Sequence, residues 1–145
     1  MDAETARVVT SFDDCGFART LGLRVIAVED GAVTVAMDGE GTFNRSGAVH
    51  GGAIFALADH AFGCAANLAG HEVTLAAEIS YLSPATGPLT ATARRAAVTP
   101  TVSLYRVEVR QGDRLIALFS GHGFRLGEGS RGLLNLPEDK PDCDG

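Results

Sequence analysis

The feature that most constrains this chain is the stretch 52–68, which has the length of a helix and is apolar nearly all round. A helix that is apolar on every side is buried by other elements and does not lie on a surface. Asp59 and His60 interrupt this stretch. Because burying a carboxylate costs free energy unless it is compensated, Asp59 predicts either an internal ion pair or a functional group. The rest of the chain must therefore enclose a helix that carries one charge.

Most of the remaining segments have the residue types and the turn signals of strands. Two-residue turns are expected at Asp30-Gly31 and at Gly112-Asp113. Residues 3–14 have apolar positions at helical spacing and predict a short N-terminal helix, and residues 38–49 are rich in Gly and are expected to form a loop. The predicted strands are 23–29, 32–37, 72–82, 89–98, 102–110 and 115–125.

One sheet can cover a buried helix only if it curls round that helix. The order of the elements therefore predicts an α+β fold, in which a curled antiparallel sheet of about five to six strands wraps round one long helix. The outer face and the edges of such a sheet stay open, which favours an obligate dimer. Residues 1–126 are expected to form a single domain, and the change in composition after it predicts a loose tail over 127–145.

Charge and composition exclude several classes of function. The net charge of −6 argues against nucleic acid and anionic membranes as main partners, because both require concentrated Lys and Arg. No apolar run is expected to span a bilayer, and no signal peptide is apparent. Three scattered cysteines predict reduced thiols in a cytoplasmic protein. The four histidines have no metal-ligand spacing, so we expect neither a metal site nor a cofactor.

Two adjacent glycines, Gly51 and Gly52, stand where the apolar helix is expected to begin. The first N–H groups of a helix have no partner inside it, and they can hold a developing oxyanion. Asp59 lies about two turns further along the same helix. A free N–H donor and a carboxylate on one helix suggest acyl-transfer chemistry without a metal.

The run from Asn44 through His50-Gly51-Gly52 to Leu57-Ala58-Asp59, followed by the segment 79–84 (ISYLSP), resembles the hotdog-fold acyl-CoA thioesterases. The similarity is greatest to the phenylacetate-degradation subgroup and runs from about residue 21 to residue 126. It implies the hotdog fold and hydrolysis of a small or aromatic acyl-coenzyme A without a cofactor. The chain departs from the family in the turns before its fourth and fifth strands. In the family, the second of these turns often contacts the coenzyme A phosphates.

Carried over by position, the resemblance implies a role for each of four residues. Asp59 corresponds to the catalytic carboxylate, Gly51 to the N–H that polarises the thioester carbonyl, and Asn44 to a residue that orients the carboxylate or the attacking water. Thr74 falls near the position of an assisting hydroxyl. The residues expected to bind substrate are His50 and Gly52 at the helix start, with His50 capping the turn, and Arg94 and Arg95, with Arg106, as candidates for the phosphates.

Gly51 and Asp59 lie about 12 Å apart along one helix. Productive contacts are about 3 Å, so one thioester cannot use both groups of the same chain. We therefore expect each site to combine Gly51 of one subunit with Asp59 of its partner, as in the family's dimer, and we expect two dimers to form a tetramer. Asp59 can act as nucleophile or as general base. The alternatives are a non-catalytic acyl-CoA sensor and a hotdog hydratase or dehydratase.

Overall fold

The computed structural model describes residues 1–127, which form three helices and six strands. The helices are α1 (Ala3–Asp13), α2 (Gly16–Leu21) and α3 (Gly51–Ala69). The strands are β1 (Arg24–Glu29), β2 (Ala32–Met37), β3 (Glu72–Tyr81), β4 (Leu89–Val98), β5 (Val102–Gln111) and β6 (Arg114–Arg125).

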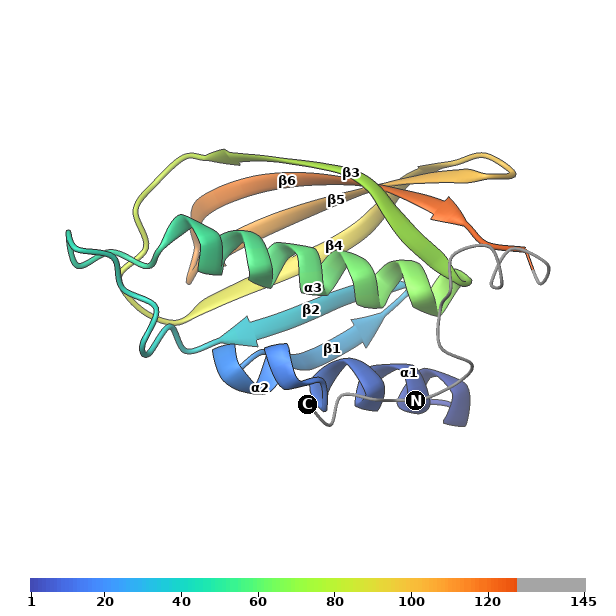
Figure 1. Cartoon of the computed structure of the whole chain (residues 1–145), viewed down its shortest axis with the longest axis horizontal. Coiled ribbons are helices and arrows are strands. Elements are labelled where there is room, and N and C mark those ends of the chain that lie inside the picture. The colour runs from blue at the N-terminus through green and yellow to red at the C-terminus, as the bar shows by residue number, and fades with distance from the viewer. Residues whose placement is uncertain (128–145) are drawn as a thin grey trace.

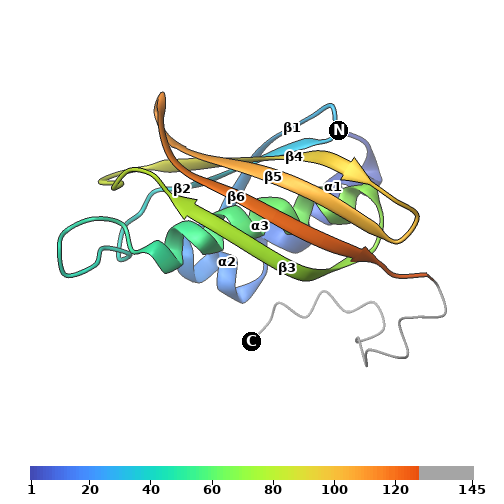
Figure 2. The ribbon, with the colours of Figure 1, turned by 90° about the horizontal axis from the view of Figure 1, so that it is seen from above.

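The six strands form one antiparallel sheet in the order β1-β2-β4-β5-β6-β3. The sheet curls round α3, which runs along its concave face, while α1 and α2 lie beside the β1 edge (Figure 1). The view from above shows the strands crossing over the helices (Figure 2). The predicted α+β fold with a curled sheet round one long helix is therefore confirmed.

The predicted turn between β1 and β2 has the backbone that its sequence indicates. Asp30 and Gly31 have φ angles of 51° and 77°. A type I′ turn needs positive φ at both central residues, and Asp-Gly supplies it at little cost. The local sequence therefore accounts for the turn of the β1–β2 hairpin.

Helix α3 is buried because the sheet packs closely against it. Phe62 and Cys64 are among its fully buried residues. The ring of Phe62 lies so close to β6 that a Cβ atom at Gly121 would be 2.7 Å from it. Only glycine fits at that point of the sheet, so the approach of α3 to β6 is set by one missing side chain.

By length and composition, α3 is the one helix within residues 1–127 that could cross a membrane. The expectation that no run would be long enough is wrong on that count. However, 61% of the apolar window is buried inside the protein. A core helix enclosed by a sheet is apolar for the same reason as a membrane helix, because both exclude water.

Helix α2 was not predicted, because a helix of six residues is too short to show apolar periodicity. The residues on either side of α2, Cys15 and Gly22, determine where it begins and ends. The Cys15 Sγ accepts a hydrogen bond from the Ala18 N–H at 3.4 Å, and Gly22 adopts the left-handed conformation at φ 67°. The predicted tail lies outside the described residues from 128 onward.

Gly121→Ala should lower the free energy of unfolding by about 1–3 kcal/mol, because the new methyl group overlaps the Phe62 ring. Urea denaturation followed by circular dichroism measures this. Ser120→Ala, at the half-buried neighbouring position, is the control and should stay close to wild type. Unchanged stability of the Gly121 variant would contradict the packing described here.

Candidate active site

Helix α3 begins with a histidine cap. His50 has extended backbone angles, and its Nδ1 accepts a hydrogen bond from the Gly52 N–H at 2.8 Å. The N–H groups of Ala53 and Ile54 donate to the His50 carbonyl. The Gly51 N–H has no hydrogen-bond acceptor within residues 1–127. Of the two glycines, Gly51 therefore has the free donor.

Tyr81, at the end of β3, holds the Gly51–Gly52 peptide at the start of the helix. Its hydroxyl donates to the Gly51 carbonyl at 2.9 Å. A Cβ atom at position 51 would lie 3.3 Å from the Tyr81 Cζ, so a side chain there would press on the ring. The sequence singled out the segment around Tyr81 only as part of a motif, and no local signal revealed its contact with the helix start.

Asp59 is half-buried on α3. Burial raises the pKa of its carboxyl, and within the described chain no hydrogen bond or ion pair opposes that effect. A structural acid inside a fold is normally paired. The unpaired carboxylate therefore favours a functional role over a structural one.

His60, which follows Asp59, faces a different side of the helix. It is buried, and the Phe12 ring meets it edge-on with centroids 5.3 Å apart. Burial lowers the pKa of its imidazole, against an opposing effect of Asp13. As expected, the two adjacent side chains form no dyad.

The half-buried side of α3 forms a winding stripe, defined as Gly51, Phe55, Asp59, Gly63 and Asn67. Four residues advance an α-helix by about 400°, so each member is rotated about 40° from the one before. The stripe thus starts beside Tyr81 and β3 and ends on the side where α1 packs. Asp59 is at its midpoint, half-exposed between these two neighbours.

Asn44 lies in the loop before α3, and its side chain has a defined orientation. Its Oδ1 accepts hydrogen bonds from the backbone N–H groups of Ser46 and Ala48, at 2.8 Å and 3.2 Å. With the oxygen occupied, the amide NH₂ is the free end of the side chain. Asn44 can therefore act on a substrate or a carboxylate only as a hydrogen-bond donor.

Thr74 lies near the start of β3, paired with Gly123 beside a bulge. Its side chain is exposed, and within residues 1–127 no hydrogen bond joins it to Asp59. Its role as an assisting hydroxyl stays a prediction. So do the substrate-binding roles of His50 and Gly52, whose side chain and N–H bind each other.

The two predicted arginines do not form one site. Arg94 pairs across the sheet with Arg106, and Arg95 with the buried Tyr105, whose core-facing position places Arg95 on the inner face. Because successive strand residues point to opposite faces, Arg94 is on the outer face. A phosphate bound by Arg94 would meet Arg106, not Arg95.

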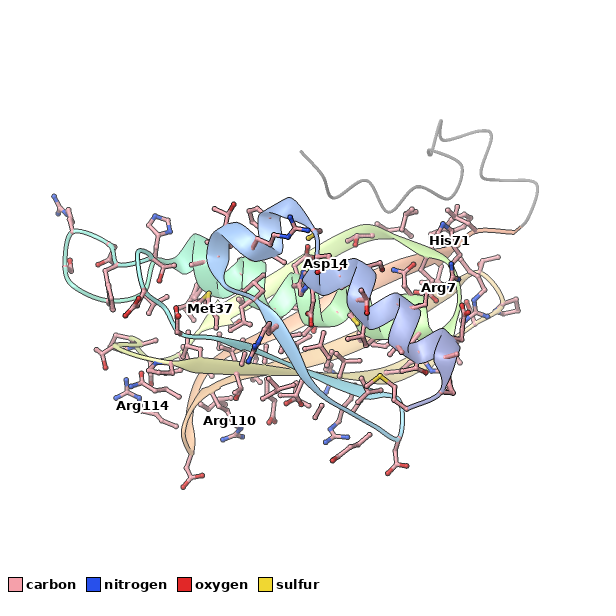
Figure 3. The ribbon with its side chains drawn as sticks, turned by 90° about the horizontal axis from the view of Figure 1, so that it is seen from below. Arg7, Asp14, Met37, His71, Arg110 and Arg114 are labelled. Atoms are coloured by element: carbon pink, nitrogen blue, oxygen red, sulfur yellow. The ribbon has the colours of Figure 1, made fainter. Side chains whose placement is uncertain are left out.

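A cavity of about 480 Å³ opens at the end of the sheet, away from the stripe. In Figure 3, Arg110 extends from the sheet on the side away from the helices, near this cavity. None of the predicted site residues lines it. The lining residues are Gly22, Arg24, Ala36, Met37, Asp38, Pro88, Leu89, Thr90, Arg110 and Gly112.

Comparison with known proteins gives consistent matches. The thioesterase superfamily model matches residues 46–117. The acyl-coenzyme A thioesterase PaaI of Escherichia coli is 34% identical over 129 residues, which cover 86% of this chain and 91% of that protein. A structure of E. coli PaaI superposes with a TM-score of 0.79 at 30% identity, covering 86% of this chain and 94% of that one. The structure of a mutant phenylacetic acid degradation protein PaaI from Thermus thermophilus superposes with a TM-score of 0.73 at 35% identity. It covers 76% of this chain and 98% of that one.

His50→Ala should lower the free energy of unfolding by about 0.5–2 kcal/mol, because the Gly52 N–H loses its acceptor. His50→Asn keeps a capping oxygen and should recover most of the loss. Thermal unfolding of the three proteins measures the difference. If the Ala and Asn variants were equally stable, capping would not be the role of this side chain.

Proposed function

Because the chain belongs to the thioesterase superfamily, we propose that it hydrolyses an acyl-coenzyme A to the free acid and coenzyme A. One observation carries the proposal. A free N–H at Gly51 and an unpaired carboxylate at Asp59 lie on the same half-buried stripe of α3. The similarity to PaaI proteins favours small or aromatic acyl groups, of which phenylacetyl is the first to test.

In this proposal the Gly51 N–H binds the carbonyl oxygen of the thioester. The positive end of the α3 dipole adds to its effect. A donor aimed at the tetrahedral oxyanion is worth about 3 kcal/mol in the transition state. The His50 carbonyl is in the same peptide unit as this N–H and accepts from the Ala53 and Ile54 N–H groups, which keeps the N–H from turning away. The Tyr81 hydroxyl holds the next peptide unit through the Gly51 carbonyl.

Asp59 drives the attack on the thioester carbon by one of two routes. As nucleophile, its oxygen forms an anhydride, the C–S bond breaks and the thiolate leaves; water then hydrolyses the anhydride. As general base, it takes a proton from water, the hydroxide attacks, and the proton passes to the leaving thiolate. In both routes the Asn44 NH₂ is suited to hold the carboxylate or the water.

The two groups act in a homodimer. Eight residues separate Gly51 from Asp59, about 12 Å along the helix, so one substrate cannot reach both in one chain. Strand β3 is an edge strand of ten residues, and its outer edge pairs with no other strand of the described chain. Leu75 and Tyr81 on it are more than half exposed. A long edge with exposed apolar side chains is suited to pair with a second copy.

Thiol release from phenylacetyl-coenzyme A, detected with a chromogenic disulfide, tests the proposal. Asp59→Asn should lower kcat about 10²–10⁴-fold while leaving the unfolding temperature no lower than wild type. Asp113→Asn, in the exposed β5–β6 turn, is the control and should be fully active. Near-normal turnover by the Asp59 variant would contradict the assignment.

The same assay separates two other functions. Binding of acyl-coenzyme A without thiol release would indicate a sensor. Hydration of an unsaturated acyl-coenzyme A without thiol release would indicate a hydratase. The wild-type protein therefore decides the reaction, and the Asp59 variant decides the residue.

A further inference from the structure

The N-terminal helix α1 covers part of α3, although none of its residues is fully buried. One of its contacts is made by the half-buried Phe12, whose ring meets His60 edge-on with centroids 5.3 Å apart. The same ring lies against Gly63, where a Cβ atom would be 3.2 Å from the Phe12 Cε1. Phe12 therefore rests on the backbone of α3 at a point without a side chain.

Gly63 is an unusual residue for its position. It lies in the interior of a 19-residue helix, where glycine is less favourable than alanine by about 0.5–1 kcal/mol. An alanine there would press on the ring, since 3.2 Å is closer than ordinary contact. The glycine thus makes room for the Phe12 ring at this level of the helix.

This contact places Phe12 beside the proposed reaction centre. Gly63 follows Asp59 by one turn on the stripe, and His60 follows it in sequence. The ring therefore borders the stripe just beyond the carboxylate, as Tyr81 borders it at Gly51. A group attached to a thioester carbon at Asp59 has the ring as its neighbour on the α1 side.

The ring is held in place by the ends of α1. Asp13, the next residue, accepts a hydrogen bond from the β1 backbone N–H of Val25 at 2.8 Å. At the other end, Asp2 caps the helix by accepting from the Thr5 N–H. A wall that is anchored to the sheet can limit the size of a ligand, whereas a free helix would move aside.

We propose that Phe12 is a specificity-determining residue that forms the distal wall of the acyl site and limits the length of the acyl group. The inference rests on the proposed thioesterase function and adds to it the residue that limits the length of the acyl group. A flat ring one helical turn beyond Asp59 leaves room for a short or aromatic acyl group and can contact an aromatic one by its edge or face. A longer chain would have to displace the ring from Gly63.

The test compares kcat/KM for butanoyl-, hexanoyl-, octanoyl- and phenylacetyl-coenzyme A. Phe12→Ala should raise the octanoyl-to-butanoyl ratio of kcat/KM at least about tenfold, because removal of the ring makes room for a few more methylene groups of the acyl chain. Gly63→Ala should act in the opposite direction and lower the phenylacetyl rate, because the methyl group pushes the ring. Phe17→Ala, a matched change at a residue 60% exposed on α2, should leave the ratio unchanged.

The outcomes separate this inference from the proposed function. If the wild-type protein hydrolyses these substrates and Phe12→Ala keeps the wild-type ratio, the wall is not Phe12, although the enzyme is a thioesterase. If Phe12→Ala lowers all four rates by the same factor, the ring has only a structural role, and Phe12→Leu, which retains bulk and fold, should then restore all four rates equally. No hydrolysis by the wild type would overturn both proposals.

Discussion

The packing of α3 against the concave face of the sheet is the interaction on which the rest of the structure depends. A helix that is apolar on nearly every side needs more cover than a flat sheet gives, and six strands provide it by curling. Phe62 against Gly121 shows how close the two layers come. The sheet and α1 still leave one winding stripe of α3 half-exposed, and Asp59 is at its midpoint. The packing of the helix thus also decides where the candidate site lies.

The candidate site combines two features of α3, the start of the helix and the carboxylate of Asp59. At its start, α3 has a histidine cap that occupies the second glycine N–H and leaves the first one free. Further along, Asp59 is placed where burial raises the pKa of its carboxyl and where no group of the described chain compensates it. The missing compensation is the strongest physical reason to look to a second subunit and a substrate. The unpaired edge of β3 gives that subunit a place to bind.

Much of the fold could be predicted because its signals are local and repeated. Alternating strands, an Asp30-Gly31 turn and a long apolar helix each follow from short-range preferences. Helix α2 was missed because six residues hold too little pattern. The start of α3 at Gly51 could be predicted because a motif marks it, and the catalytic roles of Gly51 and Asp59 stay predictions. The contacts of Tyr81 and Phe12 join residues far apart in sequence. The pairing of Arg94 with Arg106 depends on strand register, which the sequence alone does not define.

The central claim is that each active site takes Gly51 from one subunit and Asp59 from the other. Two inactive chains test it when co-expressed with different affinity tags. One carries Asp59→Asn; the other carries Gly51→Pro, which removes the N–H at the first helical position, where proline is tolerated. Mixed dimers should recover about half of the wild-type activity, because one of their two sites is intact. Gly51→Ala, which keeps the N–H, is the control and should stay active. If that control is active and the mixed dimers are as inactive as either parent, the shared site is contradicted.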